Sequence, residues 1–259
     1  MNHEMIENQG FKGRASLLNE VERFIGYSPV YYRSNLYMHT SRVNWLCEEL
    51  IPLARESISN FNPWVALSLP LVHDDPEIIT KDVLLSKKYK MTKEEKMDLR
   101  KEEIRAINIL SKVWPEEVNG INYKNLLYLA LNKNTVEAKF VSFVDKFDAL
   151  CESLHELYAG NKEFYNRGED NIRPPANGSA ITRLRREYFE LTPLFSINHP
   201  FLRPLIKIYP YKILEEGKLH TLDSVLKKTG LPHYDFWRET IIKHSGKEGL
   251  IWLTERKEQ

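Results

Sequence analysis

An apolar run that ends in adjacent histidine and aspartate side chains constrains this 259-residue chain more than any other feature. Residues 64–72 read WVALSLPLV, which is apolar on every side and about the length of a helix, so the run predicts a buried helix. His73 and Asp74 follow it directly. Polar groups that leave water without partners are costly, and one divalent cation satisfies an imidazole nitrogen and a carboxylate oxygen together. The dipeptide alone is common, but together with His39 upstream, Glu77 and Asp82 just after, and Asp145 on a later helix, it predicts a metal site at the end of a buried helix.

A proline sets the expected geometry of the residues after this pair. Pro76 disfavours helical backbone at Asp75, so the buried helix is expected to end at Asp74 or Asp75. Pro76 can then begin a second, short helix. Such a break would bring Glu77 and Asp82 to the same pocket as His73 and Asp74, which one continuous helix would not do. The alternative, in which Glu77 follows His73 by one helical turn, stays open from the sequence alone.

Other segments carry the three- and four-residue apolar spacing of amphipathic helices. The two longest run from His39 to about Ser57 and from about Thr135 to Tyr158. A shorter helix is predicted over residues 16–25, and the mixed-charge stretch 87–105 has the character of a solvated helical face. Asp145 interrupts the second long helix, where a carboxylate is costly unless it meets a buried polar group or a metal. The chain is thus predicted to be all-α.

Composition excludes several classes of protein. Hydrophobic residues make up 42% and charged residues 28%, which is ample for a soluble core, and the net charge of +1 gives no argument for a nucleic-acid partner. Cys47 and Cys151 lie in helical patterns and indicate neither a disulfide framework nor a zinc finger. No apolar run reaches the roughly 18 residues of a membrane helix. The polar start, residues 1–14, lacks the core of a signal peptide, so the cytoplasm is the expected location.

Domain organisation is indicated by a loop rich in glycine, proline and asparagine at residues 166–179. It divides the chain into a first domain, residues 1–165, and a C-terminal helical extension, residues 166–259, that is expected to pack on it. Helices are predicted in the extension over residues 180–191, 202–216, 222–228 and 234–244.

The order of the polar residues carries a resemblance to a known superfamily. His39, the His73–Asp74 pair and Asp145 fall in that order on separate predicted helices, and they resemble the metal set of the HD-domain phosphohydrolases. The resemblance covers roughly residues 15–165 and implies an all-helical HD-domain bundle.

A narrower motif is similar to the YfbR-like 5′-deoxynucleotidase branch of that superfamily. The pattern His-Asp-x-x-Glu-x-x-x-x-Asp begins at His73 and ends at Asp82, and a late helix reads FVDKFDAL over residues 143–150. The branch often has glycine before the last aspartate of the motif, where this chain has Lys81.

The resemblance implies a metal-dependent hydrolase. One divalent ion, Mn, Co, Mg, Zn, Ni or Fe, would be held by two imidazole nitrogens and two carboxylates. Such an ion lowers the pKa of bound water and polarises a phosphoryl oxygen. Glu77 would be the base or water-positioning group, and Asp82 would orient the water or the leaving nucleoside. The implied metal ligands are His39, His73, Asp74 and Asp145.

The substrate implied by the resemblance is a small-molecule nucleotide, a nucleoside or deoxynucleoside 5′-monophosphate. Its phosphate is expected to pair with an arginine, either Arg33 or Arg23. Arg33 is preferred because it lies six residues before His39 in a tyrosine-rich stretch. Two alternatives stay open: hydrolysis of a triphosphate, cyclic or signalling nucleotide, and a metal-binding HD scaffold without catalysis. A homodimer is compatible with the resemblance.

Overall fold

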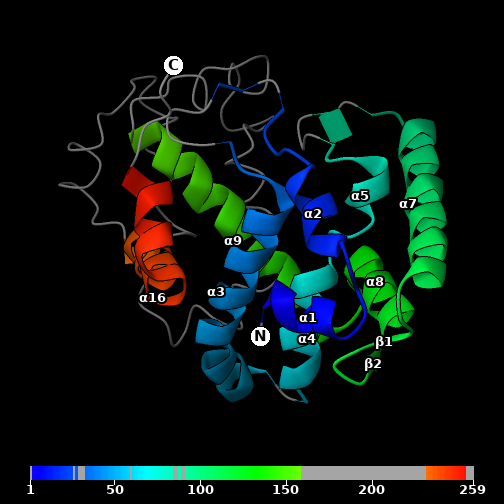
Figure 1. The fold of residues 1–259 in the computed structure, drawn as a ribbon, viewed down its shortest axis with the longest axis horizontal. Coiled ribbons are helices and arrows are strands. Elements are labelled where there is room, and N and C mark those ends of the chain that lie inside the picture. Colours follow the sequence, from blue (N-terminus) through cyan, green and yellow to red (C-terminus); the bar gives the residue numbers. More distant parts are fainter. Residues whose placement is uncertain are drawn as a thin grey trace. The chain divides into compact units, whose positions relative to one another are not determined.

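The computed structural model describes residues 2–25, 27–28, 33–58, 60–83, 87–88, 91–158 and 232–254. These residues fall into two compact units, those within 1–25 and 33–145 and those within 26–32 and 146–259, and each unit is described by itself. Helices make up most of both, and the one sheet among the described residues is a two-stranded hairpin (Figure 1), so the predicted all-α class is confirmed. Within the same residues, no helix combines the length and apolarity needed to cross a membrane.

The first unit begins with two short helices, α1 (His3–Asn8) and α2 (Arg14–Asn19). The helix predicted over residues 16–25 is wrong at both ends, because α2 starts earlier and ends at Asn19. The chain beyond it leaves helical geometry: Glu22 forms an isolated antiparallel bridge with Asn35, and Phe24 has a left-handed φ of 51°. Residues 20–25, which leave α2 and pair with Asn35 just before the next helix, are therefore called the return loop.

Helices α3 (Leu36–Ser57) and α4 (Pro63–Val72) pack against each other at the centre of the unit. The α3 helix starts three residues before the predicted His39, because the Asn35 side chain caps it by accepting from the Met38 amide. The predicted buried run forms α4, with Pro63 in its first turn, where a missing N–H is harmless. Its buried residues are Ala66, Ser68, Leu69, Pro70, Leu71 and Val72.

The predicted break is confirmed, but α4 ends at Val72, ahead of the predicted Asp74 or Asp75. His73 still has helical φ and ψ, the next residues turn, and Glu77 begins a separate short helix, α5 (Glu77–Thr80). The residue that ends α5 is Lys81, at φ 63° and ψ 161°. This backbone region is almost reserved for glycine, so Lys81 is a strained position one residue before Asp82.

The rest of the first unit covers this core. Helix α7 (Lys93–Val113) opens on a capping box formed by Thr92 and Glu95, and it packs on α5 and α8 (Tyr123–Asn132). Neither α8 nor the hairpin before it, formed by β1 (Glu117–Val118) and β2 (Ile121–Asn122), was predicted from the sequence. The buried face of α8 carries Tyr123, Leu126 and Leu127.

The long helix α9 (Val136–Tyr158) matches the prediction over residues 135–158 and begins in the first unit. Glu137 accepts a hydrogen bond from the Asn62 amide at 2.8 Å, and the Phe140 ring meets Phe61 edge to face at 5.3 Å. These contacts hold the first part of α9 beside the start of α4, so that Asp145 is carried by a well-anchored helix.

The second unit contains the remainder of α9 and helix α16 (Pro232–Thr254), which includes the predicted helix 234–244 and kinks at Gly246. The Trp237 indole donates to Asp148 at 2.7 Å, and the Tyr234 hydroxyl lies 2.6 Å from the His155 imidazole. The predicted domain boundary and the helices predicted over 180–191, 202–216 and 222–228 lie outside the described residues.

Candidate metal centre

His39 lies in the first turns of α3 and is completely buried. Its Nε2 atom is 3.4 Å from Asp74 Oδ2 and 3.2 Å from Asp145 Oδ1. The histidine therefore lies between two carboxylates that come from segments about 70 residues apart in the sequence.

His73 is placed by the end of α4, and its ring is oriented by the helix itself. Its Nδ1 atom is 2.7 Å from the carbonyl oxygen of Pro70. A carbonyl oxygen can only accept a hydrogen bond, so Nδ1 carries the proton and Nε2 keeps its lone pair. Nε2 lies 3.3 Å from Asp74 Oδ2. Metal-binding histidines in proteins commonly have this arrangement, in which the other ring nitrogen donates to a backbone carbonyl.

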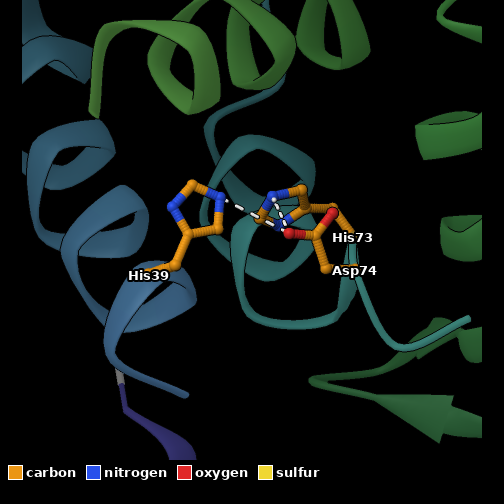
Figure 2. Close-up of side chains that lie close together, drawn as sticks. All are labelled: His39, His73 and Asp74. Atoms are coloured by element: carbon orange, nitrogen blue, oxygen red, sulfur yellow. Dashed lines mark ion pairs between the residues drawn. The ribbon is translucent and has the colours of Figure 1, made fainter. Parts of the chain in front are cut away.

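His39, His73 and Asp74 together form a group that can hold a metal ion. One ligand atom from each lies within 4.8 Å of the others, and Figure 2 shows the His39 ring from α3 approaching the His73 and Asp74 side chains at the end of α4. Ligands at about 2.1 Å from one ion stand about 3.0–3.4 Å apart in octahedral or tetrahedral geometry. The two nitrogen-to-Asp74 distances, 3.4 and 3.3 Å, match that spacing. Both the donor set and its dimensions fit a divalent cation.

Asp145 adds a second carboxylate to this group. It stands on α9, is nearly buried, and faces the His39 nitrogen that also faces Asp74. The structure thus brings together all four residues that the sequence analysis named as ligands. Two nitrogens and two carboxylates suit a metal of intermediate hardness.

The electrostatics of Asp74 favour the ionised form. Burial on its own would raise the pKa of this carboxyl, and Asp145 acts in the same direction. The imidazoles of His73 and His39, together with the Arg23 guanidinium, outweigh both and hold the pKa of Asp74 below its usual value. An ionised carboxylate can bind a cation without first losing a proton.

Arg23 and Arg33 occupy different environments. Arg23 is largely buried, with Nη1 3.9 Å from Asp74 Oδ2. The Arg33 guanidinium lies against the return loop, with Nε 3.4 Å from the Glu22 carboxylate and Nη1 donating to the Phe24 carbonyl. Arg23 therefore has a contact with the ligand cluster itself, at Asp74, whereas these two Arg33 contacts are to Glu22 and Phe24.

Glu77 lies at the start of α5 beside the ligand pair. Burial, followed by the nearby carboxylates of Asp74 and Asp82, raises the pKa of Glu77 well above its usual value, while Lys88 and Arg23 oppose the rise. The Lys88 ammonium stands 3.9 Å from Glu77 Oε1. A carboxyl group with a raised pKa next to a candidate metal site is suited to accept and return protons near neutral pH.

Lys88 was not identified from the sequence. It belongs to a stretch of interleaved charges whose pattern indicates a solvated surface, and its only distinguishing signal is that it follows Asp82 by six residues. A lysine just beyond a cluster of three carboxylates could have been considered on grounds of charge alone.

Comparison with protein families gives one match. Residues 11–174 match the family described as 5′-deoxynucleotidase YfbR-like. Among curated proteins, no match was found.

Solved structures give several matches of similar fold. An HD-domain phosphohydrolase from Listeria innocua aligns with a TM-score of 0.56 and 22% sequence identity, over 92% of this chain and 99% of that one. A protein described as a predicted metal-dependent phosphohydrolase, from Magnetospirillum magnetotacticum MS-1, aligns with a TM-score of 0.53 and 14% identity, over 78% of this chain and 92% of that one. At these identities the two structures establish a shared fold, that of HD-domain proteins.

Proposed function

This chain belongs to the YfbR-like 5′-deoxynucleotidase family of phosphohydrolases, and on that premise we propose that it removes the phosphate from nucleoside 5′-monophosphates, deoxynucleotides among them. The observation that carries the proposal is the convergence of His39, His73 and Asp74 on one point, with Asp145 beside it. Arg23 and Glu77 flank the same point and supply a charge for the phosphate and a group for proton transfer.

In this proposal the four converging side chains hold one divalent ion. His39 and His73 offer Nε2 atoms, and Asp74 and Asp145 offer carboxylate oxygens. The bound ion supplies Lewis acidity toward a phosphoryl oxygen and makes a water molecule more acidic. The His73–Pro70 hydrogen bond keeps the imidazole in the tautomer that binding requires.

Glu77 is the proton acceptor of the proposed reaction. Its raised pKa, caused by burial and by neighbouring carboxylates, suits a group that takes a proton from the attacking water and later releases it to the leaving nucleoside. Lys88 faces the same carboxylate and limits that rise, so that Glu77 can still be ionised when the water must be deprotonated. Asp82, next to Glu77, is proposed to orient the water or the leaving group.

Arg23 is the proposed phosphate-binding residue. A guanidinium can donate two parallel hydrogen bonds to a phosphate, and its charge offsets the part of the phosphate charge that one divalent ion leaves unbalanced. Its position beside Asp74 supports this role over Arg33.

The test is a phosphate-release screen with purified full-length protein. Ribo- and deoxynucleoside 5′-monophosphates are assayed with Mn²⁺, Co²⁺ or Mg²⁺, beside nucleoside triphosphates and cyclic nucleotides. The proposal expects inorganic phosphate from monophosphates and little product from the other classes. Pyrophosphate or triphosphate release, or opening of a cyclic nucleotide, would move the activity to another nucleotide. No turnover of any substrate by metal-loaded protein would favour a scaffold.

The choice of arginine is tested with two matched variants. Arg23→Lys keeps the positive charge but loses the paired donors, so KM for a monophosphate should rise while metal content is unchanged. Arg33→Lys serves as the control and should leave KM near the wild-type value. A silent Arg23→Lys beside an impaired Arg33→Lys would restore the assignment made from sequence distance.

A further inference from the structure

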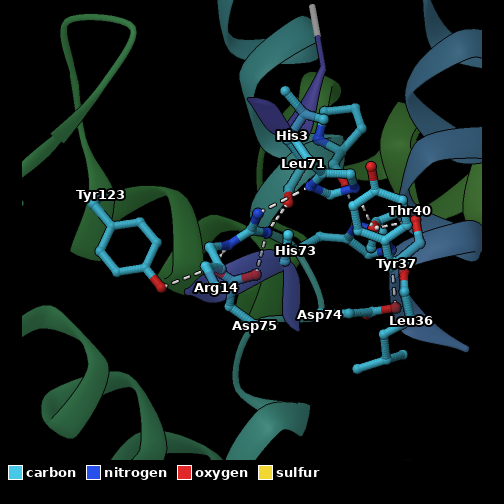
Figure 3. Close-up of polar contacts among 12 residues, drawn as sticks. His3, Arg14, Leu36, Tyr37, Thr40, Leu71, His73, Asp74, Asp75 and Tyr123 are labelled. Carbon is cyan, nitrogen blue, oxygen red and sulfur yellow. Dashed lines mark hydrogen bonds and ion pairs between the residues drawn. The ribbon is translucent and has the colours of Figure 1, made fainter. Parts of the chain in front are cut away.

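A completely buried arginine, Arg14 of α2, reaches both sides of the proposed ligand pair. Its Nε donates to Asp75 Oδ2 at 2.8 Å, and its Nη2 donates to Asp75 Oδ1 and to the Leu71 carbonyl oxygen. Leu71 lies two residues before His73, and Asp75 follows Asp74 directly. One planar guanidinium therefore ties together the two flanks of the His73–Asp74 dipeptide, as Figure 3 shows.

The same guanidinium is linked to the helix that carries His39. Nη1 of Arg14 lies 3.0 Å from His3 Nδ1, and since a guanidinium has only donors, that nitrogen must accept. The His3 proton is then on Nε2, which donates to Thr40 Oγ1 at 3.0 Å, while the Thr40 hydroxyl donates to the Leu36 carbonyl at 2.7 Å. Burial and the Arg14 charge lower the pKa of His3 to about 3, in keeping with a neutral ring.

Tyr123 of α8 completes the cluster from the other side. Its hydroxyl donates to Asp75 Oδ2 at 2.8 Å, so Asp75 accepts from Tyr123 and from Arg14. The donor and the acceptor of each hydrogen bond in this cluster are thus determined, and each of the side chains is buried. We call the five residues the Arg14 network: His3, Arg14, Thr40, Asp75 and Tyr123.

We infer that the Arg14 network positions the metal ligands, by setting the spacing between His39 on α3 and the His73–Asp74 turn. It is anchored one residue from each: Thr40 follows His39, and Asp75 follows Asp74. Its members are positioning residues, because they act on the ligands through the backbone that carries them. The inference rests on the proposed metal site, and it explains what fixes the distance between His39 and the His73–Asp74 pair in that site.

Helix α1 is connected to the metal site through His3, a member of the Arg14 network. His3 lies outside residues 11–174, the part of the chain that matches the family. Its ring is buried, contacts Arg14 and Thr40, and has its centroid 4.5 Å from the tilted ring of Tyr37, two residues before His39. Ligand geometry must be held to within a fraction of an ångström for full function, so a clamp on both ligand-bearing segments has functional consequences.

The experiment compares three network variants with one control in the full-length chain. Arg14→Lys keeps the charge, but one ammonium cannot bridge Leu71 and Asp75 as the planar fork does. His3→Ala removes the link to Thr40, and Tyr123→Phe removes one donor to Asp75. Leu126→Ala on α8 deletes a completely buried apolar side chain and should lower stability by a route that bypasses the network.

Three quantities are measured for each protein: Mn²⁺ affinity of chelator-treated protein by competition with an indicator dye, kcat and KM for a deoxynucleoside monophosphate, and urea unfolding in chelator. Arg14→Lys should bind Mn²⁺ about 10-fold or more weakly, the usual effect of changing a group that orients a metal ligand. Its kcat should fall more than KM rises. His3→Ala and Tyr123→Phe should show smaller losses in the same direction, and Leu126→Ala should lose stability with wild-type Mn²⁺ affinity.

Network variants that lose stability but keep wild-type Mn²⁺ affinity and kcat would overturn the inference and leave the network a purely structural one. If Arg14→Lys fails to fold, His3→Ala and Tyr123→Phe decide by the same criterion. Wild-type protein that binds no divalent ion would refute the proposed site itself, and the network's role with it. That failure is distinct from one in which wild type binds metal and the variants bind it equally well.

Discussion

Asp74 and Asp75 are neighbours in the sequence but lie in two differently built polar clusters. Asp75 is completely buried and accepts from Arg14 and Tyr123, so its charge and its lone pairs are met by the protein. Asp74 faces two imidazole nitrogens and, through His39, a second carboxylate. His73 donates from Nδ1 to the Pro70 carbonyl, so its Nε2 atom has a lone pair, and this lone pair faces Asp74. In the Asp75 cluster each hydrogen-bond donor meets an acceptor. In the Asp74 cluster, atoms that can ligate a metal lie close to one another.

The difference between the clusters separates a structural role from a ligand-binding one. A buried network whose donors and acceptors all match stabilises one arrangement of the chain and needs nothing else. A cluster of converging lone pairs and carboxylates costs free energy until a cation binds it. The hydrogen-bonded network around Asp75 therefore lies one residue away from a cluster, around Asp74, that a cation would stabilise.

The sharpest way to separate the two clusters is to remove each aspartate in turn. Asp75→Ala leaves the Arg14 guanidinium buried without its counter-ion, which typically destabilises by about 3–5 kcal/mol. Asp74→Ala should destabilise the chelator-treated protein by less than half as much, yet abolish Mn²⁺ binding. Urea unfolding in chelator measures the first effect and dye competition the second. Equal losses of stability in the two variants would contradict the division.

Glu77 should behave unlike either aspartate. Glu77→Gln keeps the size of the side chain but cannot accept the proton, so kcat should fall roughly 100-fold, equivalent to about 2.7 kcal/mol of barrier. Metal content should stay at the wild-type level and KM should change less than kcat. Elemental analysis and steady-state kinetics check the variant. Normal turnover would transfer the proton-accepting role to another group, with Asp82 the next candidate.

The matched cluster should also respond to acid, through His3. The pKa of His3 is about 3 in the folded protein and near 6.5 when unfolded, so its contribution to stability is complete above pH 6.5 and is lost as the pH falls toward 3. Arg14 faces the ring and opposes its protonation. Between pH 6.5 and 5 the stability advantage of wild type over His3→Gln should shrink by about 2 kcal/mol. Parallel stability curves for the two proteins across this range would contradict the buried neutral ring.

The smallest expected effect concerns the strained residue Lys81, which lies between Glu77 and Asp82 in the motif. Lys81→Gly should stabilise the protein by about 1 kcal/mol, because glycine adopts the Lys81 backbone angles without strain. Lys133→Gly is the matched control, since Lys133 ends α8 in the ordinary left-handed region, at φ 51° and ψ 39°. It should gain less. Thermal unfolding compares them, and a larger gain at Lys133 would show that Lys81 is not strained.

The sequence predicted the features that local patterns encode. Apolar spacing located α3, α4 and α9, and Pro76 correctly predicted the break before Glu77. The start of α3 was predicted at His39 but lies at Leu36, because the capping residue Asn35 lies before the apolar positions on which the prediction relied. Helix α8 had a usable signal, three apolar residues at positions i, i+3 and i+4, that was overlooked.

What the sequence could not provide was pairing between distant residues. Arg14 and Asp75 are 61 positions apart, and neither stands in a local motif that names the other. The position of Arg23 is a second example: sequence distance from His39 favoured Arg33, whereas the fold places the Arg23 guanidinium 3.9 Å from Asp74. The candidate ligands were found because each stands at a conspicuous place, a polar side chain inside or at the end of an apolar helix.

The most direct test of the central claim is the metal content of the purified protein, measured together with phosphate release. Wild-type protein should bind about one divalent ion per chain, lose deoxynucleoside monophosphate hydrolysis when chelated, and recover it when Mn²⁺ or Co²⁺ is restored. His73→Ala should bind no ion and release no phosphate under any of these conditions. A His73→Ala protein that binds one ion per chain and hydrolyses the nucleotide at the wild-type rate would contradict the account.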